Sequence, residues 1–113
     1  MHELSIAQSI VDIVIEQMKI HSLSRVESVM LRIGVLRGIV VDSLNFGFDV
    51  TVRETPMEGA KLVVETVPIR GRCITCNQEF TIGHWLDDCP FCNSHTVEIT
   101  SGKELEIAGI EVA

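Results

Sequence analysis

Four cysteines constrain the fold of this 113-residue chain more than any other feature, because they form two CxxC pairs separated by twelve residues. Each CxxC turn directs two thiolates at one point, and two such turns complete a tetrahedral four-sulfur shell suited to zinc. A shell filled entirely by protein ligands predicts a structural site, and zinc can contribute on the order of 10 kcal/mol to the folding of a segment with little core. The predicted zinc ligands are Cys73, Cys76, Cys89 and Cys92.

Three alternatives to this four-cysteine zinc site remain open. A CxxC pair can act as a thiol–disulfide couple, although redox sites normally present one pair at a helix start rather than two pairs in register. His84 and His95 lie near the pairs and offer alternative ligands, although a solvated loop histidine is more common. A zinc ribbon can also bind nucleic acid, but the two arginines of segment 70–95 are outnumbered by three acidic residues.

An amphipathic helix is predicted at the start of the chain. Over residues 4–20, apolar side chains beginning with Leu4 recur every three or four positions, and polar residues occupy the opposite side. The helix begins either at Ser5, which can form a capping box with Gln8, or earlier, with Glu3 in its first turn. In both cases residues 1–3 lie at the N-terminal end of the helix.

A second helix and three strands complete the predicted main domain. The helix covers about 43–53, with Asp42 as its cap and with Phe46 and Phe48 in or near the core. Apolar and polar residues alternate in three further segments, and the alternation in the last one changes parity around Gly109, which predicts a bulge. The predicted strands are 26–33, 62–67 and 104–112.

The fold class that follows is α+β, with an α/β-like layer of two helices on a small three-stranded sheet. Residues 70–95 contain all four cysteines and few aliphatic side chains, so we interpret them as an inserted zinc-ribbon module with two CxxC knuckles. The main domain is then discontinuous and comprises residues 1–69 and 96–113.

Composition excludes several classes of function. The net charge of −7 argues against nucleic-acid binding, which usually needs a basic face. No apolar run approaches the roughly 18–20 residues of a membrane span, and the first residues lack the basic start of a signal peptide, so we expect a cytoplasmic protein without a membrane partner. Because no nucleophile–base arrangement or phosphate loop is present, we do not expect an enzyme.

A second metal site is suggested by Met1, His2 and Glu3. The α-amine, the backbone nitrogen of His2 and its imidazole can close adjacent chelate rings, and nitrogen donors in a plane favour nickel(II) or copper(II). Glu3 can add an oxygen or a backbone nitrogen. The residues alone favour a simpler interpretation, in which Met1 is the initiator, His2 is a surface residue and Glu3 complements the helix dipole.

Several motifs together favour the metal-site interpretation of the N-terminal triplet. The Met1-His2-Glu3 start leads directly into a helix, Leu31-Arg32-Ile33-Gly34 ends a strand, Glu58-Gly59 precedes Leu62, and paired CxxC knuckles follow in the second half. With these motifs the chain resembles the HypA/HybF family of hydrogenase maturation factors over essentially its whole length.

The resemblance implies a nickel metallochaperone that delivers nickel for [NiFe]-hydrogenase together with the GTPase HypB and the hydrogenase large subunit; some relatives also serve urease. It implies nickel binding by Met1, His2 and Glu3 and zinc binding by the four cysteines. A zinc-ribbon adaptor that binds proteins without transporting metal is the alternative. Some relatives carry a histidine beside each CxxC, whereas Asn77 and Asn93 stand here, so cysteine-to-histidine exchange at the zinc is not expected.

Overall fold

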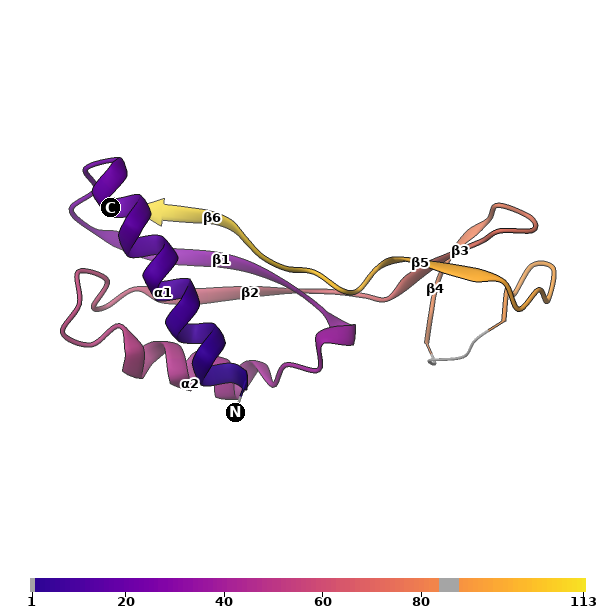
Figure 1. Cartoon of the computed structure of the whole chain (residues 1–113), viewed down its shortest axis with the longest axis horizontal. Helices are drawn as coiled ribbons and strands as arrows, with labels where there is room; N and C mark the ends of the chain where they lie inside the picture. Colours follow the sequence, from indigo (N-terminus) through magenta and orange to yellow (C-terminus); the bar gives the residue numbers. More distant parts are fainter. Residues whose placement is uncertain (1, 84–87) are drawn as a thin grey trace. The chain divides into compact units, whose positions relative to one another are not determined.

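A computed structural model of the chain describes residues 2–83 and 88–113 and confirms the α+β class (Figure 1). Two helices accompany two three-stranded sheets, whose strand orders are β2-β1-β6 and β4-β3-β5. The helices are α1 (His2–Ile20) and α2 (Val41–Thr51), with a short 3-10 helix η1 (Val35–Arg37) between them. The strands are β1 (Val26–Gly34), β2 (Lys61–Val67), β3 (Arg70–Cys73), β4 (Glu79–Thr81), β5 (Val97–Ser101) and β6 (Leu105–Val112).

The described chain forms two compact units, each of which is discontinuous in sequence. The helix unit consists of Met1–Arg32, Ile39–Glu65 and Glu106–Ala113, and it contains both α-helices. The cysteine unit consists of Ile33–Gly38 and Thr66–Leu105, and it contains the sheet β4-β3-β5. Within the described residues, neither helix is long and apolar enough to cross a membrane.

The core of the helix unit follows the predicted periodicity with two exceptions. Phe46 is 71% exposed although it was expected in or near the core, because Leu44 and Phe48 occupy the buried side of α2 and the residue between them lies on the other side. Leu4, at the start of the predicted apolar stripe, is 50% exposed. The buried residues of α1, β1 and α2 include Ala7, Ile10, Val11, Val14, Met18, Val29, Leu31, Leu44 and Phe48.

The starts of both helices correct the predicted caps. The first helix includes His2, which confirms the earlier of the two predicted starts, with Glu3 in the first turn; Ser5 lies inside the helix and does not begin it. The N-cap residue of α2 is Val40, whose extended backbone (φ −82°, ψ 108°) satisfies the geometry of a cap, whereas Asp42 lies within the first turn. Asp42 is therefore not the cap, and its charge instead complements the positive end of the helix dipole.

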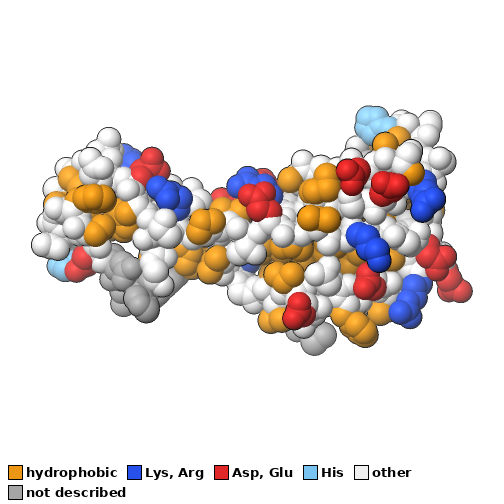
Figure 2. Space-filling view, turned by 180° about the vertical axis from the view of Figure 1, so that it is seen from behind, with side chains coloured by type: hydrophobic (Ala, Val, Ile, Leu, Met, Phe, Trp, Pro, Cys, Tyr) orange, Lys and Arg blue, Asp and Glu red, His pale blue; other side chains and the backbone are white. Residues whose placement is uncertain are grey.

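Side-chain contacts join β1 and β6 in the sheet of the helix unit, and the bulge expected near Gly109 stays a prediction. Ser28 donates a hydrogen bond to Glu111 (2.9 Å), and Arg32 forms an ion pair with Glu106 (2.9 Å). Four positions separate the two β1 residues and five separate their β6 partners, a difference of one residue that a bulge in β6 would explain. On the face shown in Figure 2, acidic and basic side chains lie beside one another, among apolar ones.

The cysteine unit is built on β3, which pairs antiparallel with both β4 and β5. Its small core contains Phe80 and Ile82 beside two of the cysteines. Gly71 permits this packing, because a β-carbon there would lie 2.7 Å from the Val97 side chain and 2.8 Å from that of Ile82. None of the three strands of this sheet was predicted individually from the sequence.

Candidate metal centres

The four cysteines converge on one point. Their Sγ atoms all lie within 4.8 Å of one another, and all four thiols are free. The Sγ atoms of Cys73 and Cys92 are 3.5 Å apart, and those of Cys76 and Cys89 are 3.6 Å apart. A tetrahedral site with metal–sulfur distances of about 2.3 Å has sulfur–sulfur edges of about 3.8 Å, so the cluster needs little adjustment to enclose a zinc-sized ion.

Both CxxC segments adopt the same backbone turn. The N–H of Asn77 donates to the carbonyl oxygen of Cys73, and the N–H of Asn93 donates to that of Cys89, each at 2.8 Å. Asn77 (φ 65°) and Asn93 (φ 63°) are both left-handed, a conformation that asparagine tolerates better than most residues. The asparagine that follows each pair is thus a local sequence signal of this turn.

In the metal-free cluster, backbone N–H groups, neighbouring thiols and burial shift the pKa values of the cysteines in different directions. The Cys76 N–H, 3.5 Å from Sγ, lowers the pKa of Cys73 to about 6, against the opposing effect of burial. For Cys92, the Ser94 N–H lowers the pKa, but the Cys73 thiol, burial and the other two thiols outweigh it and raise the pKa to about 12. The Gln78 N–H similarly fails to offset burial and neighbouring thiols, so the pKa of Cys76 is raised. In the metal-free cluster Cys73 therefore ionises readily, whereas Cys76 and Cys92 resist ionisation.

Side chains outside the ligand set link and orient the two turns. Arg72 donates to the Asn77 side-chain oxygen (2.7 Å) and forms an ion pair with Glu98 on β5 (2.9 Å). The Thr75 and Ser94 hydroxyls share a hydrogen bond of 3.0 Å, which joins the first CxxC turn to the second. These contacts fix the turns through polar groups in a unit with few buried apolar side chains.

His95, the histidine near the pairs that the structure describes, does not join the thiol cluster. His95 is largely exposed, and its Nδ1 lies 2.7 Å from the Asp88 carboxylate. His84 lies outside the described residues. Among the described residues, the group placed to share one ion therefore consists of the four cysteines alone.

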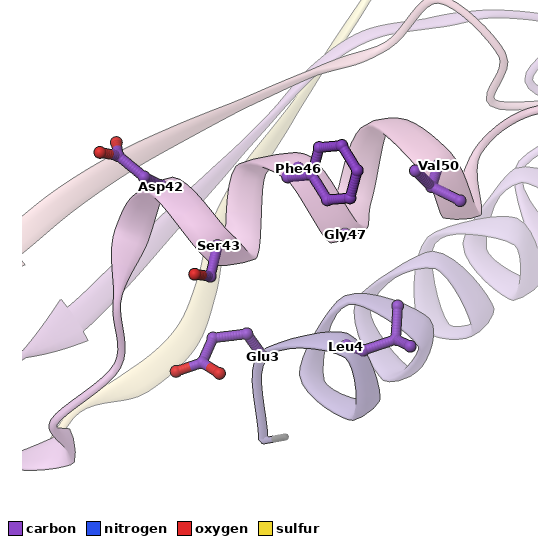
Figure 3. Close-up of a pocket in the computed structure, with 7 residues that line it drawn as sticks. All are labelled: Glu3, Leu4, Asp42, Ser43, Phe46, Gly47 and Val50. Carbon is purple, nitrogen blue, oxygen red and sulfur yellow. The ribbon is translucent and has the colours of Figure 1, made fainter.

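The N-terminal triplet is only partly described. Met1 lies outside the described residues, and His2 is the first residue of α1. Glu3 follows in the first turn, and its Oε2 accepts a hydrogen bond of 3.2 Å from the backbone N–H of Val40. Sequence patterns did not indicate this contact. Beside Glu3 is a cavity of about 520 Å³ (Figure 3), lined by Glu3, Leu4, Asp42, Ser43, Phe46, Gly47 and Val50.

The fold and the cysteine cluster define a small α+β protein with a four-thiol centre suited to a metal ion. The family model described as "Hydrogenase/urease nickel incorporation, metallochaperone, hypA" matches residues 1–112. The chain belongs to this HypA family, as its sequence motifs predicted.

Individual relatives agree with this assignment. The "Hydrogenase maturation factor HypA" of Geobacter metallireducens is 43% identical over 112 residues, and that of Chlorobaculum parvum is 40% identical; each alignment covers 99% of both chains. The "Solution structure of HypA protein" has a TM-score of 0.76 at 23% identity and covers 100% of this chain and 97% of that one. The Ni metallochaperone HypA from Helicobacter pylori has a TM-score of 0.67 at 22% identity, with coverages of 97% and 96%.

Proposed function

We propose that this chain is a non-enzymatic nickel carrier that binds nickel through Met1, His2 and Glu3 and delivers it during maturation of [NiFe]-hydrogenase. The four cysteines hold a structural zinc ion in this proposal. Membership in a hydrogenase/urease nickel-incorporation family is the observation that carries it. The proposed partners are the GTPase HypB and the hydrogenase large subunit, and urease maturation is a second destination within the family. Four free thiols suit the reducing cytoplasm.

The chemistry of the two donor sets supports this division of roles. The α-amine of Met1 and the backbone and imidazole nitrogens of His2 can form adjacent chelate rings, and such nitrogen-rich, near-planar sets favour nickel(II). The cysteine cluster instead supplies the closed four-sulfur shell that is typical of structural zinc. A recipient can dismantle an open site at a chain end more easily than a closed cage, which suits the N-terminal site to transport.

Nickel titration of protein with a native N-terminus tests the proposal. We expect about one nickel site, lost in His2→Ala with unchanged zinc content. His21→Ala is a matched control, because His21 is exposed and lies just beyond the other end of α1. One residue added before Met1 should also weaken nickel binding by displacing the amine. Equal nickel binding by His2→Ala and the wild type would refute the carrier function.

A zinc-ribbon adaptor without metal transport is the second candidate. It is favoured by Ile74 and Phe91, which lie between the cysteines of the two pairs and are 56% and 62% exposed, as expected for a protein-binding surface. The adaptor predicts that His2→Ala leaves hydrogenase maturation intact while Ile74→Ser/Phe91→Ser impairs it. The carrier predicts that His2→Ala abolishes maturation.

A further inference from the structure

The side chain of Glu3, in the first turn of α1, caps the start of α2. Its carboxylate accepts the backbone N–H of Val40, which is the N-cap residue of α2 and lies 37 positions away in sequence. In a capping box, this N–H is bonded by a Glu or Gln three residues into the same helix, but that position in α2 is Ser43. The first turn of α1 thus supplies the missing acceptor, and Figure 3 shows the Glu3 side chain extending toward the start of α2.

Apolar packing holds the same turn of α1 at a second point. A β-carbon at Gly47 of α2 would lie 3.5 Å from the Leu4 side chain and 3.6 Å from that of Ala7, so the first turns of α1 lie directly against α2 at this position. Glu3 and Leu4 therefore attach the start of α1 to α2 through one polar and one apolar contact. The residues that precede Glu3 in sequence are therefore joined to a turn that these two contacts restrain.

We propose that Glu3 is a positioning residue for the nickel site and that its carboxylate is not a nickel ligand. This inference rests on the proposed nickel-carrier function. The carboxylate binds the Val40 N–H and lies near the positive ends of two helix dipoles, where its negative charge is stabilised. Coordination of nickel through Oε2 would compete with this hydrogen bond, which joins the two helices. The donors then come from Met1, from His2 and from the backbone, while the carboxylate holds the turn.

Two substitutions at Glu3 separate positioning from ligation. In Glu3→Gln the side-chain oxygen can still accept the Val40 N–H, but the anionic donor is gone. We expect nickel affinity within about threefold of the wild type and an unchanged absorption spectrum of the nickel complex, since the donors are unchanged. In Glu3→Ala the link between the helices is lost, and nickel affinity should fall by roughly 10–100-fold, the usual effect of removing a group that orients metal ligands. An equal loss in both variants, or a changed spectrum in Glu3→Gln, would identify the carboxylate as a ligand and overturn the inference.

A third variant distinguishes positioning from general stability. Val40 is 55% exposed and has the extended backbone of a cap, so Val40→Ser can cap α2 from its own chain. In Glu3→Ala/Val40→Ser we expect thermal stability to recover while nickel affinity stays low, because the first turn of α1 still lacks its hydrogen bond to α2. Recovery of nickel affinity in this double variant would overturn the positioning role. Absence of nickel binding in the wild type would reject the proposed function itself, whereas loss in Glu3→Gln alone rejects only this inference.

Discussion

At neutral pH the metal-free protein should carry a thiolate at Cys73, while Cys76 and Cys92 stay protonated. With a pKa of about 6, this thiol is roughly nine-tenths ionised at pH 7. Cys92, with a pKa of about 12, and Cys76, whose pKa is raised above 9.0, remain protonated. Ultraviolet thiolate absorbance should therefore rise in a first step near pH 6, and Cys73→Ser should remove that step.

Zinc binding must then expel the protons of Cys76 and Cys92. Protons compete with the metal for these two sulfurs, so zinc affinity increases with pH, by about tenfold per pH unit for each proton released. Two protons give at least about a hundredfold increase between pH 7 and pH 8. Competition with a chromophoric chelator, corrected for the protonation of the chelator, measures this slope. A slope near tenfold per unit, or no absorbance step near pH 6, would refute the charge distribution inferred from the N–H···S contacts.

Three substitutions test the packing. Gly47→Ala should stabilise the protein by roughly 0.5–1 kcal/mol in thermal unfolding, because its β-carbon would meet Leu4 at ordinary contact distance and the helix loses a glycine; destabilisation would contradict this. Gly34→Ala should destabilise by at least about 3 kcal/mol in chemical denaturation, since its β-carbon would coincide with the Gly102 carbonyl; wild-type stability would disprove the close approach. Arg32→Ala should cost less than about 1 kcal/mol, and high salt should abolish the difference, because its ion pairs are exposed; a salt-independent loss would indicate a packing role instead.

Periodicity in the sequence predicted most of the fold, and its failures have specific causes. Helix α1 is marked by a regular apolar stripe, but its start was ambiguous because Ser5 imitates a cap while lying inside the helix. Asp42 was chosen as a cap by residue type, although the backbone turns at Val40, which offers no capping side chain. Strand β5 is only five residues long, and its residues were assigned to the main domain because the module was ended at residue 95, so its weak alternation was not recognised as part of the sheet of the cysteine unit.

The two candidate metal centres differ in how much of each can be found from sequence. The cysteine cluster is visible because CxxC spacing already places each pair of thiolates, and the repeated asparagine identifies the turn. The bond between Glu3 and Val40 joins residues 37 positions apart and has no local pattern. It depends on how α1 packs against α2, which the apolar stripes predict only as two buried faces and not as a particular crossing.

The different construction of the two candidate metal centres suits the proposed roles, in which the protein would release nickel and keep zinc. Removing the proposed zinc ion from four thiolates would require breaking four bonds within a unit whose small core includes two of the cysteines, so metal loss and unfolding would be coupled. The proposed nickel donors precede a turn that Glu3 and Leu4 hold in place without contributing a side-chain donor. If Glu3→Gln retains nickel, the helix unit can stay folded while the metal leaves. Release then requires only the displacement of nitrogen ligands at the chain end, which is the property a delivery site needs.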